Sequence, residues 1–378
     1  MKTNKHKLIR TSTVPTSLQT FLDGSFGPLM DRYELVLVSS PGSELDELHE
    51  RYGMKTVGVA MERRMSPLKD VVSLWRLIRV FRRERPYMVH SMTPKAGLLC
   101  MLAAWVTRVP RRVHTFTGLV WPTASGLSRR ILMATDWLTC ACATHVIPEG
   151  KGVMNDLRHI TRKPMRVLGY GNVRGVDMHH WSRDNADAGL VESLRQEGVF
   201  TFVFVGRIVR DKGINELVEA FRRVHDAHKV RLLLVGRFED RLDPVASETR
   251  SFIDECADIV CVGQKFGKDL LACYAAADCF VFPSYREGFP NTVLEAGAMG
   301  LPSIVTDING SREIIENGKN GIVVQPKDTA ALAAAMERMM TDEPMRRQMA
   351  ENARPMIASR FEQGFVRKCM LEFYDEIM

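Results

Sequence analysis

The stretch Cys279-Phe-Val-Phe-Pro283, followed by Glu287-Gly-Phe-Pro-Asn-Thr-Val-Leu-Glu295, determines the fold expected for the second half of this chain. The apolar run predicts a buried strand, and the Gly and Pro residues after it predict a turn that opens a helix. A loop carboxylate and a helix carboxylate then line a polar pocket at the carboxyl edge of a parallel sheet. Such a pocket suits a ligand rich in hydroxyls, and the helix N-terminus beside it favours a phosphate.

Apolar, β-branched runs recur along the whole chain at intervals that leave room for a helix. The strands expected in the first half are 8–14, 34–40, 55–60, 87–91, 112–116, 144–148 and 165–169; those in the second half are 200–205, 230–235, 258–262, 278–282, 302–306 and 321–324. Strands that alternate with helices in two sets predict two α/β domains with parallel sheets. In the second set, Ile214, Leu217, Val218, Phe221 and Val224 fall on one face of a helix that begins near Gly213.

The fold class is therefore α/β, with two Rossmann-like domains. We expect residues 1–178 to form the N-terminal domain and residues 179–359 to form the C-terminal domain.

Composition limits the possible functions. The 378 residues are 45% hydrophobic and 26% charged, which is typical of a globular protein, and no apolar run has the length of a membrane span. The start lacks the apolar core of a signal peptide, so the chain is expected to be cytoplasmic. Residues 1–182 hold 27 Lys and Arg against 14 Asp and Glu, a net charge of +13, whereas the remainder carries −6. A basic half attracts polyanions such as nucleic acid, anionic lipid or a diphosphate.

Residues 73–85 alternate apolar with basic side chains and end just before Pro86. One interpretation is a helix that covers the sheet and exposes a solvated basic face. The other is a patch that lies on an anionic membrane surface.

Two cations are expected near a phosphate in the second domain. Arg207 and Lys212 lie on the turn between the strand at 200–205 and the helix that begins near Gly213. Helix N–H groups and two cations on one turn favour a diphosphate. A sugar nucleotide carries both the hydroxyls and the diphosphate.

These motifs together resemble a known enzyme family. The matching segments are Gly206-Arg207 with Lys212-Gly213, Glu287 with Glu295, Gly300-Leu-Pro-Ser-Ile-Val and Gly318-Lys-Asn-Gly321-Ile-Val-Val. They resemble the retaining glycosyltransferases of family four, which have the GT-B architecture of two Rossmann domains facing each other across a cleft. The resemblance implies that residues 1–178 bind the acceptor and that residues 179–359 bind a nucleotide sugar. It also implies that the last helix, within 360–378, returns to the N-terminal domain. The segments Val89–Gly97, Arg112–Gly118 and Val167–Asn172 resemble the capsule, O-antigen and glycan-assembly branch, which acts on undecaprenyl-diphosphate-linked sugars.

The resemblance implies a role for each matching residue. Arg207 and Lys212 would hold the donor diphosphate, Glu295 would accept hydrogen bonds from both ribose hydroxyls, and Glu287 would meet the transferred sugar. Further donor contacts would come from Gly288, Phe289, Asn291 and Thr292, and from Val262, Gly263, Gly236 and Arg237 near the base. The leaving diphosphate would help to deprotonate the acceptor, so no protein nucleophile and no cofactor are expected. No metal is expected either, because the chain has no D-x-D triplet.

On the acceptor side the pattern is less regular. Many relatives place a histidine immediately before a glycine where this chain has Thr117 and Gly118; the nearest histidine, His114, is either a core or edge residue or part of the site. Gly24 is a candidate for the glycine-rich loop after the first strand, or merely interrupts a helix. Lys95 either binds an acceptor phosphate or is a solvated lysine.

The resulting hypothesis is a transferase that moves a hexose or N-acetylhexosamine from a nucleotide sugar, UDP-linked by resemblance, to a lipid-diphosphate-linked saccharide. It would work at the inner face of the cytoplasmic membrane. One alternative is a non-hydrolysing UDP-sugar 2-epimerase, which shares the architecture. A basic nucleic-acid-binding protein is the other alternative, although no known motif or interleaved aromatic residues support it. The sequence does not specify an oligomeric state.

Overall fold

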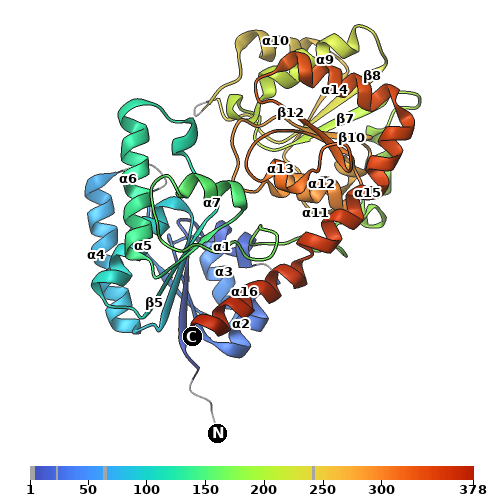
Figure 1. Ribbon diagram of the computed structural model, residues 1–378. Coiled ribbons are helices and arrows are strands. Elements are labelled where there is room, and N and C mark those ends of the chain that lie inside the picture. Colours follow the sequence, from blue (N-terminus) through green and yellow to red (C-terminus); the bar gives the residue numbers. More distant parts are fainter. Residues whose placement is uncertain (1–4, 23, 63–65, 241–242) are drawn as a thin grey trace. The chain divides into compact units, whose positions relative to one another are not determined.

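The protein folds into two compact units, each built around its own sheet (Figure 1). The structure is a computed structural model that describes residues 5–22, 24–62, 66–240 and 243–378. Unit 1 comprises the chain up to Gly175 together with Gln363–Met378, and unit 2 comprises Val176–Glu362. Each unit contains a six-stranded parallel sheet, so the expected α/β class with two Rossmann-like sheets is confirmed.

In unit 1 the strands lie in the order β3-β2-β1-β4-β5-β6. The strands are β1 (Lys7–Thr11), β2 (Glu34–Ser39), β3 (Lys55–Gly58), β4 (Met88–Met92), β5 (Arg111–Phe116) and β6 (His145–Pro148). The helices are α1 (Pro15–Leu22), α2 (Phe26–Arg32), α3 (Ser43–Tyr52), α4 (Pro67–Glu84), α5 (Pro94–Val106), α6 (Gly126–Cys142), α7 (Lys151–Leu157) and α16 (Gln363–Ile377).

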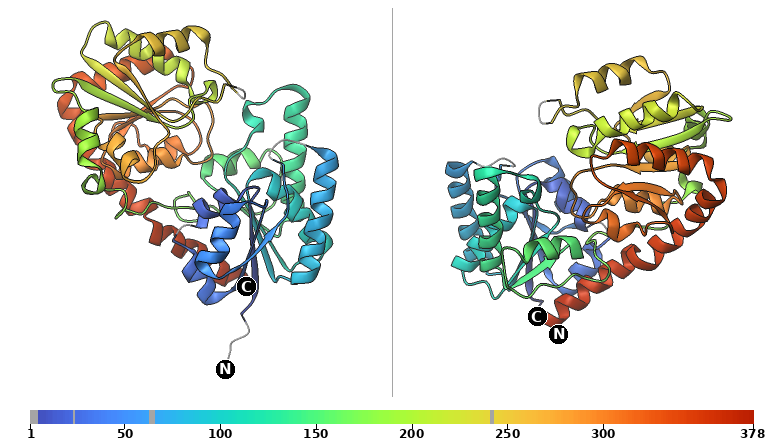
Figure 2. Two further views of the ribbon diagram at one scale, coloured as in Figure 1. Left: turned by 180° about the vertical axis from the view of Figure 1, so that it is seen from behind. Right: turned by 45° about the horizontal axis from the view of Figure 1, so that its top comes forward.

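The sheet of unit 1 is buried on both faces because helices pack on each of them, and successive side chains of its strands point to opposite faces. Ile9 and Val89 pack in the core with residues of α4, α5 and α6. Leu8 and Met88, one position away, pack in the core with residues of α1, α2, α3 and α16. Figures 1 and 2 show the two helical layers on either side of the sheet. Because α16 belongs to the second layer, the expected return of the last helix to the N-terminal domain is confirmed.

In unit 2 the strand order is β12-β11-β10-β7-β8-β9. The strands are β7 (Phe200–Val205), β8 (Val230–Val235), β9 (Ile259–Gly263), β10 (Cys279–Phe282), β11 (Ser303–Thr306) and β12 (Gly321–Val324). The helices are α8 (Ala188–Leu194), α9 (Ile214–His225), α10 (Ser247–Glu255), α11 (Gly267–Ala275), α12 (Asn291–Ala298), α13 (Ser311–Ile314), α14 (Thr329–Thr341) and α15 (Glu343–Phe361). The five apolar positions predicted for one face of a helix all lie in α9 and are all buried.

One predicted strand is wrong. Residues 165–169 form no named strand; Met165 makes a single parallel bridge to Val146 of β6. Gly169 and Gly171 have left-handed backbone conformations, which interrupt an extended strand. The first sheet therefore ends at β6.

The basic stretch at 73–85 is helical, as both of its interpretations require. It forms the second part of α4, which ends at Glu84 just before Arg85 adopts a left-handed conformation. Among the described residues, no helix combines the length and the apolar character that spanning a bilayer requires.

Candidate functional site

The order in which the chain forms the strands of the unit 2 sheet reverses between β10 and β7. The chain proceeds from β7 outward to β8 and β9, and from β10 outward to β11 and β12 on the other side. The chain therefore leaves β7 and β10 toward opposite sides of the sheet, and the carboxyl edge at such a switch point is where open α/β sheets bind ligands. Lys212 lies in the loop after β7 and Glu287 in the loop after β10.

Lys212 and Glu287 meet at this switch point. The Lys212 ammonium forms an ion pair with Oε1 of Glu287, and the same oxygen accepts a hydrogen bond from Ser284 Oγ at 2.8 Å. Lys212 Nζ also lies 5.4 Å from the centre of the Phe282 ring. Both charged side chains are only about one-sixth exposed, so water screens their attraction less than at an open surface. The sequence predicted both residues for the site but not their direct contact.

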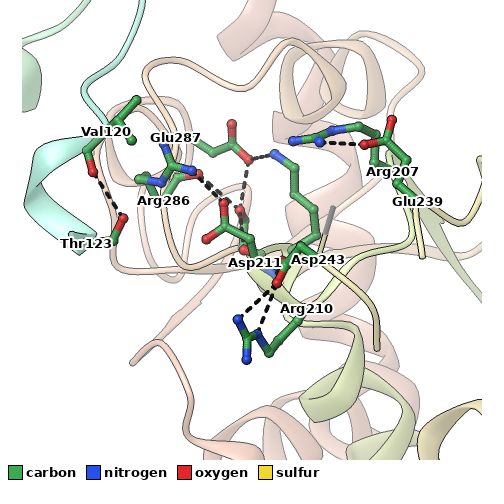
Figure 3. A network of polar contacts seen from close by, with 11 residues as sticks. Val120, Thr123, Arg207, Arg210, Asp211, Glu239, Asp243, Arg286 and Glu287 are labelled. Carbon is green, nitrogen blue, oxygen red and sulfur yellow. Dashed lines mark hydrogen bonds and ion pairs between the residues drawn. The ribbon is translucent and has the colours of Figure 1, made fainter. Parts of the chain in front are cut away.

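A second set of contacts joins the same two loops. Arg286 donates to Asp211 Oδ2 at 2.8 Å, and the Tyr285 backbone N–H donates to the Asp211 carbonyl at 3.0 Å. Asp243, from the loop after β8, accepts the backbone N–H of Asp211 at 2.6 Å and pairs with Arg210 at 3.1 Å. Figure 3 shows these pairs beside Glu287. Sequence reasoning missed this set, which fixes the loop that carries Lys212.

Arg207 is held by Glu239, which lies in the loop after β8. The Arg207 guanidinium donates to Glu239 Oε2 at 2.9 Å (Figure 3). Arg237 lies 3.8 Å from the other oxygen of Glu239. Arg207 is half exposed, unlike Lys212. Glu239 was not predicted. Its carboxylate keeps two cations close to the carboxyl edge of β7 and β8, where each remains accessible to a stronger anion.

Glu295 lies on α12, which begins at Asn291 directly after the Glu287 loop. The Glu295 side chain is buried, and its Oε2 accepts a hydrogen bond at 3.2 Å from the hydroxyl of Tyr274 on α11. Thr292 and Asn291 are half-buried in the first turn, and Gly288 and Phe289 are buried in the loop before it. Tyr274, a further residue missed by the sequence, fixes one oxygen of Glu295.

The remaining predicted donor residues continue the same edge. Val262 and Gly263 are the last two residues of β9. The Gly236 N–H, at the end of β8, donates to the Gly263 carbonyl at 2.9 Å, and the Gly206 N–H donates to the Val235 carbonyl at 2.9 Å. The twelve residues predicted for the donor side therefore lie along the carboxyl edge of four adjacent strands, β10-β7-β8-β9.

In unit 1, His114 is a core residue. It is buried in β5, bonded to Ser91 Oγ at 2.8 Å, and its ring fills the space in which a Cβ on Gly97 would stand. Burial lowers the pKa of His114 to about 3, so its ring is neutral at physiological pH. Thr117 and Gly118 follow β5 and are half-buried, with Gly118 at a φ of 127°.

Lys95 is not a solvated lysine, so that interpretation is wrong. Its ammonium lies 2.8 Å from Asp70 Oδ1, and the side chain is largely buried. Gly24 lies between α1 and α2 with a φ of 66°, and its carbonyl accepts a hydrogen bond from Arg367 of α16. This placement agrees with a glycine that interrupts a helix.

The switch point of unit 1 lies between β1 and β4. The backbone N–H of Thr13 donates to Thr93 Oγ1 at 3.2 Å, and the two hydroxyls lie 2.9 Å apart. Thr93 has a φ of 69°, an unusual conformation for a β-branched residue. Sequence reasoning missed both threonines, although Thr93 immediately precedes Pro94 at the start of α5.

A cavity of about 940 Å³ lies at the opposite edge of the unit 2 sheet. Arg183, Thr201 and Asp278 help to line it, near the amino ends of β7 and β10. It contains none of the residues predicted for the site. Among the described residues, no group of three His, Cys, Asp or Glu side chains is placed to hold a metal ion.

Comparisons with known proteins show which family the chain belongs to. The family described as "Glycosyl transferases group 1" matches residues 190–356, and the "Glycosyl transferase 4-like domain" matches residues 29–171. The chain is 30% identical over 350 residues to the capsular polysaccharide biosynthesis glycosyltransferase CapM of Staphylococcus aureus, covering 90% of each chain. It is 26% identical over 310 residues to the Escherichia coli UDP-Gal:alpha-D-GlcNAc-diphosphoundecaprenol alpha-1,3-galactosyltransferase, covering 79% of this chain and 78% of that enzyme.

Among solved structures, the Anabaena protein HepE in complex with UDP-glucose matches with a TM-score of 0.78 at 18% identity, covering 98% of this chain and 99% of that one. This likeness establishes the GT-B fold. The identity and coverage shared with the capsular enzyme establish more than the fold. The chain is a glycosyltransferase and belongs to the group 1 glycosyltransferases of family four.

Proposed function

We propose that this enzyme moves a hexose or N-acetylhexosamine from a UDP-sugar to a lipid-diphosphate-linked saccharide, with retention of the anomeric configuration. Unit 2 would bind the donor and unit 1 the acceptor, at the inner face of the cytoplasmic membrane. The observation that carries the proposal is the Lys212–Glu287 pair at the switch point of unit 2. Relatives named for undecaprenyl-diphosphate acceptors support the acceptor class.

In this proposal Lys212 and Arg207 bind the donor diphosphate. Both cations are paired with carboxylates, Glu287 and Glu239, which hold them near the carboxyl ends of β10, β7 and β8. Preorganised cations stabilise negative charge that develops on a leaving group, because they need no rearrangement during the reaction. When the diphosphate takes up the Lys212 ammonium, Glu287 becomes available for hydroxyls of the sugar.

Glu295 would bind the ribose. A carboxylate offers two acceptor oxygens on one side chain, which matches two neighbouring hydroxyls. The Tyr274 hydroxyl holds one oxygen from the α11 side, so the orientation of the carboxylate is set before the ligand arrives.

The transfer step needs no group beyond the two substrates and these side chains. The bond between the anomeric carbon and the diphosphate oxygen breaks, and the acceptor oxygen bonds to the same face of that carbon. The proton of the acceptor hydroxyl passes to an oxygen of the leaving diphosphate. The protein contributes mainly by positioning and by its cations.

A thermal-shift panel tests the proposed donor. UDP and UDP-sugars at about 100 times their Kd should stabilise the folded protein by about 2.7 kcal/mol, because they bind only the native state. For a unit of this size that is a rise in Tm of about 5–10 °C. ADP, GDP and CDP are the matched controls, and a panel in which no nucleotide raises the Tm would contradict a nucleotide-sugar site.

A further inference from the structure

Three of the five tryptophans lie exposed on adjacent helices of unit 1. Trp75 on α4, Trp105 on α5 and Trp137 on α6 are 55%, 58% and 53% exposed. Helix α5 contacts both α4 and α6, and Figures 1 and 2 show the three helices side by side over one face of the sheet. Their inner sides pack on the sheet, so the tryptophans lie on the outer side of this layer. We call this outer side the α4–α6 face.

Aliphatic side chains accompany the tryptophans on the α4–α6 face. They are concentrated at the beginning of α4 and of α6, with one at the end of α5: Leu68, Val71, Val72, Val106, Leu127 and Ile131, all exposed. Single exposed apolar residues are ordinary, but nine on three neighbouring helices mark an interaction surface.

On the α4–α6 face the exposed charged side chains of the helices are all cations; Lys69 at the start of α4 pairs with Glu62, an exposed carboxylate that precedes the helix. The exposed arginines of the face are Arg76, Arg79, Arg82 and Arg83 on α4, Arg108 just after α5, and Arg129 and Arg130 on α6. The three helices contain three carboxylates and expose none of them: Asp70 pairs with Lys95, Glu84 is buried beside Lys7, Lys55 and Arg83, and Asp136 is half-buried. Arg79 also lies over the Trp75 ring at 4.6 Å.

We infer that the α4–α6 face binds the surface of an anionic phospholipid bilayer. Tryptophan prefers the boundary between headgroups and acyl chains, and aliphatic side chains gain by entering that boundary. Each arginine near an anionic surface adds about 1 kcal/mol of attraction. This inference rests on the proposed function in one respect only: a lipid-linked acceptor lies in the membrane, so the enzyme has to reach the membrane surface.

The composition of the face disfavours other partners. In a symmetric dimer of this chain the same patch would meet itself, and the arginines of the two copies would repel each other. Single-stranded nucleic acid is held by aromatic stacking and cations, which leaves the six aliphatic side chains without a role. A bilayer accommodates all three kinds of side chain.

Vesicle co-sedimentation tests the inference with no substrate present. The full-length protein should bind vesicles of 70% phosphatidylcholine and 30% phosphatidylglycerol, and bind pure phosphatidylcholine at least about tenfold more weakly. Brominated acyl chains should quench the tryptophan fluorescence of the bound protein. The triple variant W75S/W105S/W137S should bind the anionic vesicles at least about tenfold more weakly. The variant R76Q/R79Q/R82Q/R83Q should lose most of the salt dependence of binding.

Matched controls come from unit 2. F266S replaces a side chain that is also strongly exposed, and R338Q/R347Q removes two exposed arginines. Both controls should bind vesicles like the wild type. Equal vesicle binding by the tryptophan variant and the controls would overturn the inference, as would a change from dimer to monomer in that variant or tight binding of RNA in place of vesicles.

An activity measurement separates this inference from the proposed function. With a short-chain, water-soluble acceptor the tryptophan variant should transfer sugar at the wild-type rate, whereas with a long-chain acceptor in anionic vesicles its rate should fall about tenfold. If both rates match the wild type, the α4–α6 face is not the docking surface although the transferase proposal stands. If the protein bound vesicles but transferred no sugar, the α4–α6 face would still be the membrane-binding surface, and the proposed transfer reaction would be contradicted.

Discussion

Replacing Lys212 by alanine should lower the rate of sugar transfer about 10²- to 10³-fold. The ammonium is half of the ion pair at the switch point of unit 2, and losing one preorganised group that stabilises developing charge typically costs that factor. The rate is measured under saturating donor and acceptor, and circular dichroism shows whether the variant is folded. Lys268→Ala, at an exposed lysine of α11, is the matched control and should leave the rate unchanged. A Lys212→Ala enzyme with wild-type turnover would exclude this lysine from the donor site.

A double variant separates donor binding from a structural role of the ion pair. If Lys212 served only to neutralise Glu287, Lys212→Met with Glu287→Gln would remove both charges and restore activity. We expect the double variant to be at least as slow as either single variant, because both side chains are needed by the donor. Recovery of activity in the double variant would show that the pair is structural.

Replacing Gly213 by alanine should destabilise unit 2 by roughly 2–5 kcal/mol. Gly213 has a φ of 72°, and a Cβ there would lie 2.1 Å from the carbonyl oxygen of Pro283. The left-handed conformation costs alanine about 1–2 kcal/mol, and the backbone collision adds about 1–3 kcal/mol. The collision would separate the loops after β7 and β10, which the Lys212–Glu287 pair joins. Thermal unfolding should therefore show a Tm several degrees lower.

Gly300→Ala is the control that measures the cost of the left-handed backbone conformation without the collision. Gly300 has a φ of 76°, nearly that of Gly213, but no atom lies within 4 Å of the position of an added Cβ. The Gly300→Ala variant should therefore lose only about 1–2 kcal/mol of unfolding free energy, the cost of the left-handed conformation for alanine. If the two variants melted at the same temperature, the close approach of the two loops would not contribute to stability.

The strands were predictable because a buried parallel strand has a continuous apolar run of a limited length. All twelve named strands overlap a predicted run, and the order of runs and helices was sufficient for the two-sheet architecture. The run at 165–169 failed because apolar composition alone does not reveal whether a neighbouring strand extends far enough to pair. Met165 forms a bridge to one residue of β6, and the left-handed glycines Gly169 and Gly171 then turn the chain away from the sheet.

Individual candidate residues such as Lys212 and Glu295 could be chosen from the sequence because their side-chain types suit a diphosphate and a ribose, and their roles stay predictions. Their partners could not be chosen, because Asp211, Glu239 and Tyr274 act through contacts between segments far apart in the sequence. His114 shows the opposite limit. From the sequence, a histidine in a strand is equally compatible with a core position and with a site. The structure shows that its ring is bonded to Ser91 and packs against Gly97.

The most direct measurement is a transfer reaction followed by nuclear magnetic resonance, with an α-configured UDP-sugar and an undecaprenyl-diphosphate-linked monosaccharide. We expect UDP release only when the acceptor is present, and a new glycosidic linkage with the α configuration of the donor. Conversion of the free UDP-sugar to its 2-epimer without any acceptor, or a product of inverted configuration, would contradict the central claim.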